Sequence, residues 1–384
     1  MMTRAWMPAL ANARLAPPAN AFNFMSATEQ NSAGHEGKTP LRRPPLTADD
    51  CVAGIVAGDR GILARAITVI ESQAARHEKQ AREILQKLPP RAGFAKRIGI
   101  TGVPGVGKST FIEVFGCHLI KLGHQVAVLA IDPSSSRSGG SILGDKTRME
   151  RLSQEPRAFI RPSPTGGRSG GVARRTRETM LLCEAAGFDV VIVESVGVGQ
   201  GEIALRSMVD FYLLLQLPGA GDELQGIKKG IMELADLILI NKADGENRLR
   251  AEQSRMEQET ALHYTQPPTA TWKTEVGLCS AKTGEGISRA WERIELFYQQ
   301  LEPRGILAAR RRQQLLEWLD ESVQDGLRQR FYQNPRVQAE LPAVRDAVLR
   351  GELTVPGATQ TLLAAEAGTP SETTKESPLY DQKN

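Results

Sequence analysis

The sequence predicts an α/β fold built on a doubly wound, largely parallel sheet, with helical extensions on both sides of it. Through the middle of the chain, short β-branched runs alternate with segments that have helical spacing. These runs are RIGIT, QVAVLAI, AFIRP, DVVIV, FYLLLQL, LILIN and VGLCS. Such alternation is typical of parallel sheets covered by helices. We expect the functional residues at the carboxyl ends of the strands.

Composition and charge narrow the class of protein. The chain has 384 residues, of which 41% are apolar and 24% charged, enough to bury one sizeable core plus helical additions. Its net charge of +4 is too small to indicate a nucleic-acid or membrane partner, and we expect neither. No apolar run approaches the roughly 20 residues needed to cross a bilayer. The 4 cysteines are scattered, which indicates neither a zinc site nor a disulfide framework.

Periodicity divides the chain into five segments. The first 28 residues lack Asp and Glu, a bias found in transit peptides, although an unstructured tail or a start at Met25 would look similar. Helical spacing dominates on both sides of the α/β region, and the end of the chain has no apolar period. We expect a disordered or targeting segment, a helical N-terminal arm, the α/β domain, a helical C-terminal extension and a disordered tail, at 1–45, 46–90, 91–286, 287–365 and 366–384.

The C-terminal extension carries an apolar stripe within one long helical stretch. It consists of Leu307, Leu315, Leu316, Trp318 and Leu319. A stripe of this kind indicates internal packing or a dimer surface rather than a ligand site.

The first run of the α/β region leads into a complete G-x-x-x-x-G-K-[S/T] pattern, followed by a helical segment. In this context, glycines let backbone N–H groups turn inward around phosphates, Lys108 reaches the β and γ oxygens, and the Ser109 hydroxyl ligates Mg²⁺. The pattern therefore predicts a phosphate-binding P-loop. Its residues are Gly102, Val103, Pro104, Gly105, Val106, Gly107, Lys108, Ser109 and Thr110.

Two further motifs predict that the nucleotide is GTP or GDP. Asp244 can accept hydrogen bonds from N1–H and the exocyclic amine of guanine, a donor pair that adenine lacks. A backbone N–H in the later Ser-Ala-Lys motif can meet the guanine O6. Together with the P-loop, these motifs predict a GTP-binding G domain. Their residues are Asn241, Lys242 and Asp244, and Ser280, Ala281 and Lys282.

Acidic residues follow two other runs. Glu194 ends DVVIVE in a Glu-x-x-Gly pattern, where Gly197 allows the backbone to approach the γ-phosphate; a cap of the strand at the surface is the alternative. Asp132 ends another run, so that two acids can flank Mg²⁺ and an attacking water. Asp145 lies on a Gly-rich stretch that we expect to close as a switch. This set resembles the SIMIBI-like branch of P-loop GTPases rather than the Ras branch.

Several longer blocks carry a specific resemblance. They are GVPGVGKST, IDPSSSRSGGSILGDKTRM, SPTGGRSGGVARRT, VIVESVGVGQGE, LPGAGDELQGIKKGIMELAD and NKADG. The chain resembles the MeaB/ArgK family, including the mitochondrial MMAA proteins, which are GTPase chaperones of adenosylcobalamin-dependent methylmalonyl-CoA mutase. The similarity runs from about residue 46 to residue 363.

The resemblance implies a homodimeric GTPase, slow alone and stimulated by the mutase, that gates cofactor loading and protects the bound cobalamin. Carried onto this chain, it places Asp132, Asp145 and Glu194 around Mg²⁺ and water. It also implies a further switch with Asp222 and Lys228, in which Lys228 adds positive charge to the transition state. A bacterial cytoplasm or a mitochondrial matrix would both suit such a protein.

Two positions depart from the family pattern, and three other functions stay open. Ser195 and Gly201 stand where Thr and Ser are expected, which bears on the timing of the switch. The client could be another cobalamin-dependent acyl-CoA mutase, such as isobutyryl-CoA mutase. A kinase of periplasmic amino-acid-binding proteins would need an acceptor site that the sequence does not show. A metallochaperone would need clustered histidines, and the 5 histidines are dispersed.

Overall fold

The computed structural model describes residues 46–72, 74–89, 95–132, 149–164, 169–195, 201–219 and 230–368. The chain forms two compact units, Met1–Pro45 and Leu46–Asn384, and the first lies wholly outside the described residues. Four residues with predicted roles, Asp145, Gly197, Asp222 and Lys228, also lie outside them.

A seven-stranded sheet forms the centre of the second unit. Its strand order is β3-β2-β4-β1-β5-β6-β7, and all of its pairings are parallel. The seven runs named above form these strands, which confirms the predicted doubly wound sheet. The strands are β1 (Lys96–Gly102), β2 (Val126–Asp132), β3 (Ala158–Pro164), β4 (Val190–Glu194), β5 (Phe211–Gln216), β6 (Leu237–Ile240) and β7 (Glu275–Leu278).

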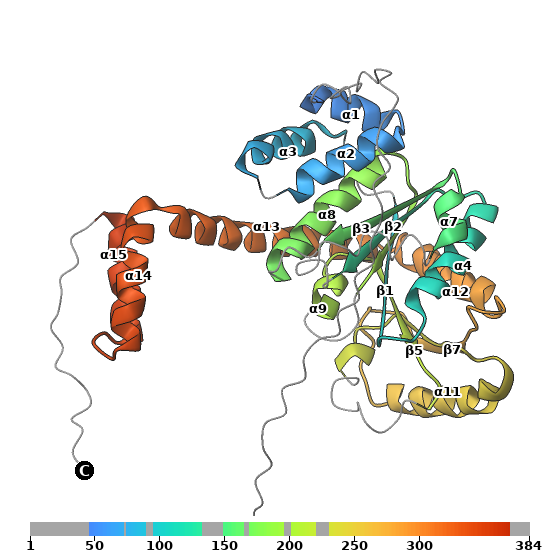
Figure 1. The fold of residues 1–384 in the computed structure, drawn as a ribbon. Helices are drawn as coiled ribbons and strands as arrows, with labels where there is room; N and C mark the ends of the chain where they lie inside the picture. Colours follow the sequence, from blue (N-terminus) through green and yellow to red (C-terminus); the bar gives the residue numbers. More distant parts are fainter. Residues whose placement is uncertain are drawn as a thin grey trace, which may run out of the picture. The chain divides into compact units, whose positions relative to one another are not determined.

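Helices cover both faces of the sheet (Figure 1). In the α/β region they are α4 (Lys108–Lys121), α7 (Glu150–Gln154), α8 (Ser169–Ala185), α9 (Gly201–Arg206), the 3-10 turn η1 (Gly245–Asn247) and α11 (Arg248–Leu262). The first helix of the predicted C-terminal extension, α12 (Ile287–Leu301), also packs on the sheet. The N-terminal helices are α1 (Ala48–Val56), α2 (Arg60–Glu71) and α3 (Ala75–Lys87). The C-terminal helices are α13 (Ile306–Gln333), α14 (Pro335–Leu349) and α15 (Val355–Ala367).

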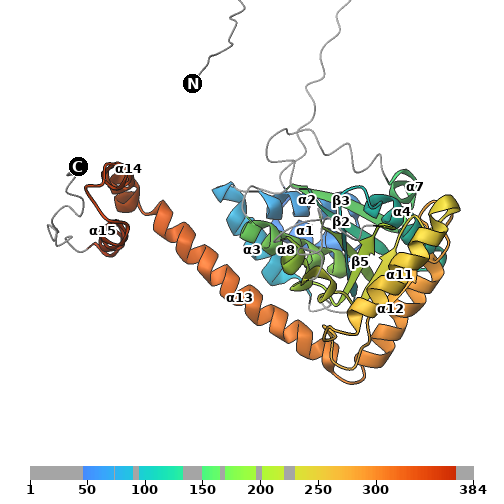
Figure 2. The ribbon, with the colours of Figure 1, turned by 90° about the horizontal axis from the view of Figure 1, so that it is seen from below.

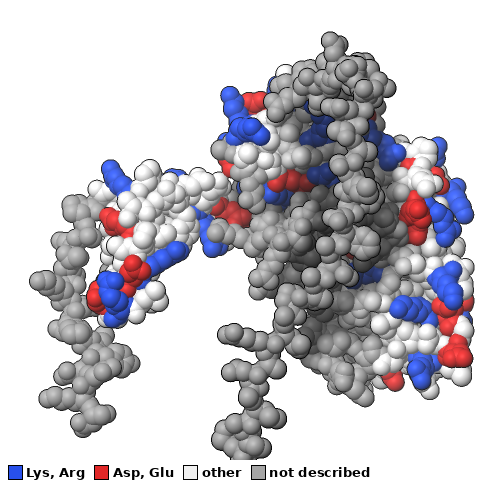
Figure 3. Space-filling view, in the orientation of Figure 1, with Lys and Arg blue, Asp and Glu red and all other residues white. Residues whose placement is uncertain are grey.

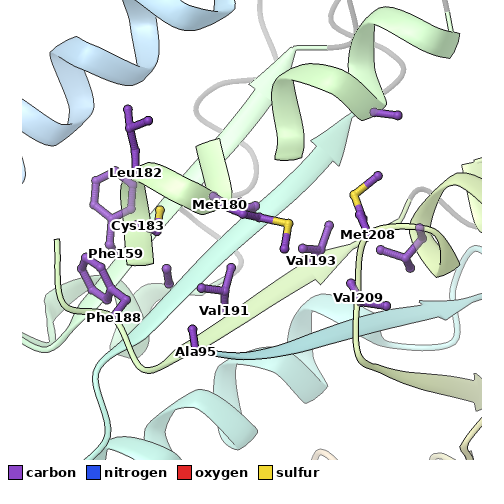
Figure 4. Packing of buried hydrophobic residues seen from close by; sticks show 14 of the residues in the cluster. Ala95, Phe159, Met180, Leu182, Cys183, Phe188, Val191, Val193, Met208 and Val209 are labelled. Atoms are coloured by element: carbon purple, nitrogen blue, oxygen red, sulfur yellow. The ribbon is translucent and has the colours of Figure 1, made fainter. Parts of the chain in front are cut away.

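Two buried apolar clusters lie on opposite faces of the sheet, because successive strand side chains point to opposite sides. On β4, Val191 and Val193 belong to one cluster, and Val190 and Ile192 belong to the other. The first cluster includes side chains of α1, α2, α8 and α9, and the second includes those of α4 and α12. Figure 4 shows Met180 of α8 near Val193 in the first cluster. The strands β2, β3, β4, β5 and β6 each place side chains in both clusters and are therefore packed from both sides.

Charge distribution on the face in view, and the length and polarity of the helices, bear on possible surface partners. In Figure 3, basic and acidic side chains are interspersed over the described part of the face in view. None of the helices in the described ranges is long and apolar enough to cross a membrane.

The helix α13 is 28 residues long, and Figure 2 shows it leading from the sheet to α14 and α15. Leu307, at its start, is 5% exposed and packs in the core. Beyond it, the three leucines of the predicted stripe face solvent: Leu315 is 57% exposed, and Leu316 and Leu319 are each 58% exposed. Trp318 is half-buried. Within the chain itself, these three leucines therefore do not serve internal packing.

A buried carboxylate fixes the start of α13 to the amino-terminal edge of the sheet. Asp210, just before β5, is 0% exposed. Its carboxylate accepts hydrogen bonds from Arg311 Nε at 2.8 Å, from the Arg97 N–H at 3.1 Å and from Tyr298 Oη at 3.0 Å. Burial by itself would raise the pKa of Asp210, but the hydrogen bond and charge of Arg311 outweigh it and hold this pKa below its ordinary value.

We expect Asp210→Asn to lower the free energy of unfolding at pH 7 by about 3 kcal/mol, because it leaves the Arg311 charge without its partner. The folded-state pKa of Asp210 lies below that of an unfolded Asp, so its contribution is complete above the unfolded pKa and is lost as the pH falls through the folded pKa. The difference between variant and native protein should therefore shrink below about pH 4. Urea unfolding followed by circular dichroism measures it.

The matched control for this prediction is Asp320→Asn, which removes the same charge from an exposed position on α13. It should change the stability by no more than about 0.5 kcal/mol. Equal stability of native protein and Asp210→Asn at pH 7 would contradict the role assigned to Asp210.

Candidate nucleotide-binding site

The predicted motifs meet at the carboxyl-terminal edge of the sheet. The P-loop follows β1, Glu194 ends β4, and the two guanine motifs follow β6 and β7. These strands all lie in one parallel sheet, so their carboxyl ends share an edge. Residues that are more than 170 positions apart in sequence, from Gly102 to Ser280, are thereby brought to one site.

The P-loop backbone needs glycine at two points for different reasons. Gly102 has φ 151°, and a Cβ there would collide with the carbonyl oxygen of Leu215 on β5. Gly107 is the N-cap of α4 in the left-handed region, at φ 94°, and a Cβ there would lie 3.0 Å from Asn241 Nδ2. The loop therefore turns tightly between β1 and α4 and stays in close contact with the guanine motif. Phosphates bind at such turns through backbone N–H groups and the helix N-terminus.

Lys108 lies folded against this loop. Its Nζ donates to the carbonyl oxygen of Gly102 at 2.8 Å. Burial is the largest influence on the Lys108 pKa and holds it below its ordinary value, while the carboxylates of Glu194 and Glu202 act in the opposite direction. The positive charge of Lys108 therefore lies next to the loop that would bind the phosphates.

Glu194 faces the start of α4 across the site. Its Oε1 accepts a hydrogen bond from Ser109 Oγ at 3.2 Å, and the residue is only 9% exposed. A cap at the surface, the alternative interpretation of this residue, is wrong because the side chain is buried against the P-loop helix. Asp132 ends the neighbouring strand β2, whose residue Ala130 pairs with Glu194, so its backbone shares this edge.

Glu202 is a site residue that the sequence did not single out. It lies in the first turn of α9, is 4% exposed, and is one of the two carboxylates that act on the Lys108 pKa. In the sequence, Glu202 could have been noticed only because it is the first acidic residue after the Glu194 motif and begins a helical segment. Periodicity gives no reason to expect that acid to be buried.

The two departures from the family pattern have different surroundings. Ser195 is 2% exposed, and its Oγ lies 2.6 Å from Thr101 Oγ1 on β1, so the hydroxyl is used in a buried hydrogen bond. Gly201 begins α9, and a Cβ there would meet nothing within 4 Å. The space around Gly201 would therefore accept a small side chain.

Asn241 joins the two ends of the site. Its Nδ2 donates to the carbonyl oxygen of Val106 in the P-loop at 2.8 Å, and its Oδ1 accepts from the Ala281 N–H at 3.1 Å. The side chain is 1% exposed, so both bonds are shielded from water. We call the two guanine motifs, residues 241–244 and 280–282, the base loop. One amide group thus fixes the P-loop and the base loop relative to each other.

Lys242 and Asp244 flank this amide. Lys242 has φ 59°, an unusual conformation for a side chain of its size, and its Nζ donates to the Gly105 carbonyl oxygen at 2.8 Å. One carboxylate oxygen of Asp244, Oδ1, accepts from Ser280 Oγ at 2.8 Å. Ser280 Oγ also accepts from the Thr283 N–H at 3.2 Å, which fixes its rotamer. Asp244 is therefore oriented by the Ser-Ala-Lys motif. Lys282, the last residue of this motif, is exposed beside it.

The donor set fits Mg²⁺. Magnesium retains several waters and takes few protein ligands, chiefly oxygens. The described residues supply the Ser109 hydroxyl and the Glu194 carboxylate in direct contact, beside a helix N-terminus that attracts phosphate. Among the described residues there is no cluster of three His, Cys, Asp or Glu side chains that would hold a softer metal.

Comparison with known proteins gives the family. The family model described as "Methylmalonyl Co-A mutase-associated GTPase MeaB" matches residues 63–336. A Caulobacter vibrioides protein named as a GTPase is 54% identical over 322 residues, which are 84% of this chain and 98% of that protein. The mouse protein "Methylmalonic aciduria type A homolog, mitochondrial" is 42% identical over 327 residues, 83% of this chain and 79% of its own.

A solved structure agrees with this result. The crystal structure titled "LAO/AO transport system kinase" has a TM-score of 0.65 and 38% identity, and covers 82% of this chain and 96% of its own. The resemblance drawn from the sequence blocks is thus confirmed, together with the expected P-loop GTPase fold. The chain belongs to the MeaB family of methylmalonyl Co-A mutase-associated GTPases.

Proposed function

We propose that this protein hydrolyses GTP to GDP and phosphate, slowly by itself and faster with a partner, as a chaperone of adenosylcobalamin-dependent methylmalonyl-CoA mutase. The observation that carries the GTPase part is the Asn241 bridge, which fixes a phosphate loop and a guanine-type loop at one edge of the sheet. The name of the matching family and that of the mouse relative support the client. Gating of cofactor loading and protection of the bound cobalamin belong to the same proposal.

Binding of the phosphates begins with a change of partner at Lys108. In this structure its Nζ donates a hydrogen bond to the Gly102 carbonyl oxygen. The β and γ oxygens are stronger acceptors because they are charged, so Lys108 turns toward them. The backbone N–H groups of residues 102–110 and the N-terminus of α4 bind the remaining phosphate oxygens.

Glu194 and Ser109 prepare the metal position. Mg²⁺, when bound, neutralises charge on the β- and γ-phosphate oxygens. Ser109 Oγ donates its proton to Glu194, so its lone pairs remain available for the ion. Asp132 and Asp145 complete the metal and water environment in this proposal. Lys228, with Asp222 in the same segment, adds positive charge when the partner is bound.

The base loop selects guanine because adenine cannot supply the hydrogen-bond donors that Asp244 requires. Asp244 is held by Ser280, and Lys242 is fixed over the P-loop by its bond to Gly105. Against adenine, the Asp244 carboxylate would lose its donors and remain unpaired, which costs more than a missing contact. The protein therefore uses GTP rather than ATP.

A homodimer is part of the proposal, with α13 as its contact surface. The apolar side chains on its outer part are at least half exposed, namely Leu315, Leu316, Leu319, Val323 and Leu327. A continuous apolar stripe on a long helix is covered most simply by the same stripe of a second copy. The bacterial cytoplasm is the compartment proposed, with the mitochondrial matrix as the alternative.

Asp244→Asn should weaken GTP binding about 100-fold, because the amide offers one acceptor where guanine needs two. Xanthosine triphosphate, which has a carbonyl at the position of the guanine amine, should regain affinity, since the asparagine N–H₂ can donate to it. Fluorescent-nucleotide titration measures both constants. Glu246→Gln, an exposed acid in the adjacent η1, is the control and should bind GTP normally. Unchanged GTP affinity in Asp244→Asn would contradict guanine recognition at this residue.

Methylmalonyl-CoA mutase should raise steady-state GTP hydrolysis at least about tenfold, because a partner-ordered cation stabilises the transition state. ATP should show no such rise. Lys228→Ala should lose most of the stimulation and keep the basal rate, whereas Lys229→Ala, its neighbour, should keep both.

The same assay separates the alternatives. Stimulation by isobutyryl-CoA mutase alone would replace the client and leave the GTPase in place. Transfer of the γ-phosphate to a periplasmic amino-acid-binding protein, without release of phosphate, would support a kinase and contradict the proposal.

Replacing Leu316 and Leu319 by Glu should convert the proposed dimer to a monomer, because charges placed in an apolar interface lose their hydration. Sedimentation velocity at micromolar concentration measures the mass. Leu249→Glu, at a 78% exposed leucine on α11, is the matched control and should remain dimeric. A native monomer would overturn the dimer, and a dimeric double variant would overturn the choice of α13.

A further inference from the structure

The segment Gly201–Asp210 connects the nucleotide site to the opposite edge of the sheet. It begins with α9 and ends directly before β5. At its start, Glu202 is 4% exposed, and the charge of its carboxylate acts on the pKa of Lys108. Farther along, the segment is seated on β1, the strand that leads into the P-loop: a Cβ on Gly99 would lie 2.9 Å from Leu205 Cγ. Displacement of α9 is therefore tied to the P-loop and its lysine.

The other end of this segment is held by α13. Gln314 Nε2 donates to the Val209 carbonyl oxygen at 2.9 Å. Arg310 donates to the Asp210 carbonyl oxygen, and Arg311 binds the Asp210 carboxylate with Nε at 2.8 Å and Nη2 at 2.5 Å. Three side chains from the first turns of α13 thus bind two consecutive residues that follow α9.

A second connection lies farther along α13. Arg177 of α8 is 6% exposed, donates from Nη2 to Ser207 Oγ at 2.6 Å and forms an ion pair with Glu321 of α13. Ser207 directly follows α9. The segment is therefore joined to α13 at two places about two helical turns apart, since Gln314 and Glu321 are separated by seven residues.

Arg206, the last residue of α9, is fixed as well. Its Nη1 lies 2.7 Å from Asp236 Oδ2, and its Nη2 donates to Thr269 Oγ1 at 3.1 Å. Arg310 of α13 donates to the same Thr269 hydroxyl at 2.5 Å. We call this set the post-α9 clamp; its members are Arg177, Arg206, Ser207, Val209, Asp210, Asp236, Thr269, Arg310, Arg311, Gln314 and Glu321.

We propose that the post-α9 clamp couples the nucleotide state to the position of α13. The inference rests on the proposed function, because it takes the P-loop as the nucleotide site. If loss of the γ-phosphate displaces α9, residues 206–210 cannot move alone without leaving buried donors and acceptors unpaired. Joint movement of α9 and the base of α13 keeps the bonds that Gln314, Arg310 and Arg311 make to residues 209–210, while the bonds of Arg206 to Asp236 and Thr269 limit how far the two helices can move. The clamp thus transmits a change at one edge of the sheet to a helix at the other.

Coupling of this kind acts in both directions. A contact on the exposed stripe of α13 that favours one position of the helix must favour one nucleotide state to the same degree. The stripe is the surface proposed for the second copy of this chain. Dimer contacts and the relative affinity for GTP and GDP are therefore linked through the clamp.

The test compares hydrogen–deuterium exchange of α13 in the full-length protein with Mg²⁺ and either GDP or a non-hydrolysable GTP analogue. In native protein, exchange over residues 306–327 should differ at least about fivefold between the two nucleotides. The double variant Gln314→Met and Glu321→Gln removes the Gln314 bond to Val209 and the Glu321 ion pair with Arg177, and it keeps the bonds of Arg310 and Arg311 to Asp210. In it the difference should fall below about twofold.

Asp320→Asn is the matched control and should retain the native difference, because Asp320 is exposed beside Glu321. Glu321→Gln alone, at a side chain that is 49% exposed, should give an intermediate value and covers the case in which the double variant unfolds. As a second readout, the ratio of the dissociation constants for GDP and the GTP analogue should shift in the double variant and stay native in the control.

The outcomes separate the coupling from the proposed function. If both nucleotides bind and α13 exchanges equally in both states, or if the double variant keeps the native difference, the coupling is wrong and the GTPase proposal stands. If neither nucleotide binds the native protein, both are wrong. A difference that is present in native protein and control, and lost in the double variant, supports the clamp.

Discussion

The parallel direction of the strands is the constraint on which the rest of the structure depends. Because every strand pairing is parallel, the carboxyl ends lie at one edge of the sheet and the amino ends at the other. The residues that follow β1, β6 and β7 meet Glu194, the last residue of β4, at the first edge, and together they form the candidate nucleotide site. At the second edge, Asp210 and Asp236 meet arginines from α9 and α13. The segment from Gly201 to Asp210 runs between the two edges.

At the carboxyl edge, the site is ordered by its own side chains. Asn241 bonds the P-loop to the base loop, Lys242 bonds Gly105, and Ser280 orients Asp244. These bonds fix the distance between the place for the phosphates and the place for the base before a nucleotide enters. Fewer side chains then have to be immobilised when the nucleotide binds, so the entropic cost of binding is smaller.

At the amino edge, buried charge is tolerated because each carboxylate is fully surrounded by donors. Asp236 accepts from the Tyr212 N–H at 2.9 Å and from the Thr269 hydroxyl at 2.5 Å, in addition to Arg206. Buried ion pairs contribute little net stability, but breaking one is costly. Such pairs are therefore suited to fixing the relative position of elements, here of α9, β5, β6 and α13.

The sequence by itself determined the seven strands, the P-loop, the guanine motifs and the family, because each depends on a run of adjacent residues or on local period. It left open whether the stripe on α13 packs inside the chain, and only the fold shows Leu316 and Leu319 at the surface. Nor did it indicate that Glu202 is buried, or that Arg311 reaches Asp210 across 101 positions of sequence. Those contacts depend on strand order and helix packing, which bring distant residues together without any periodic signal. Local pattern fixes the elements, and tertiary packing decides which charges become partners.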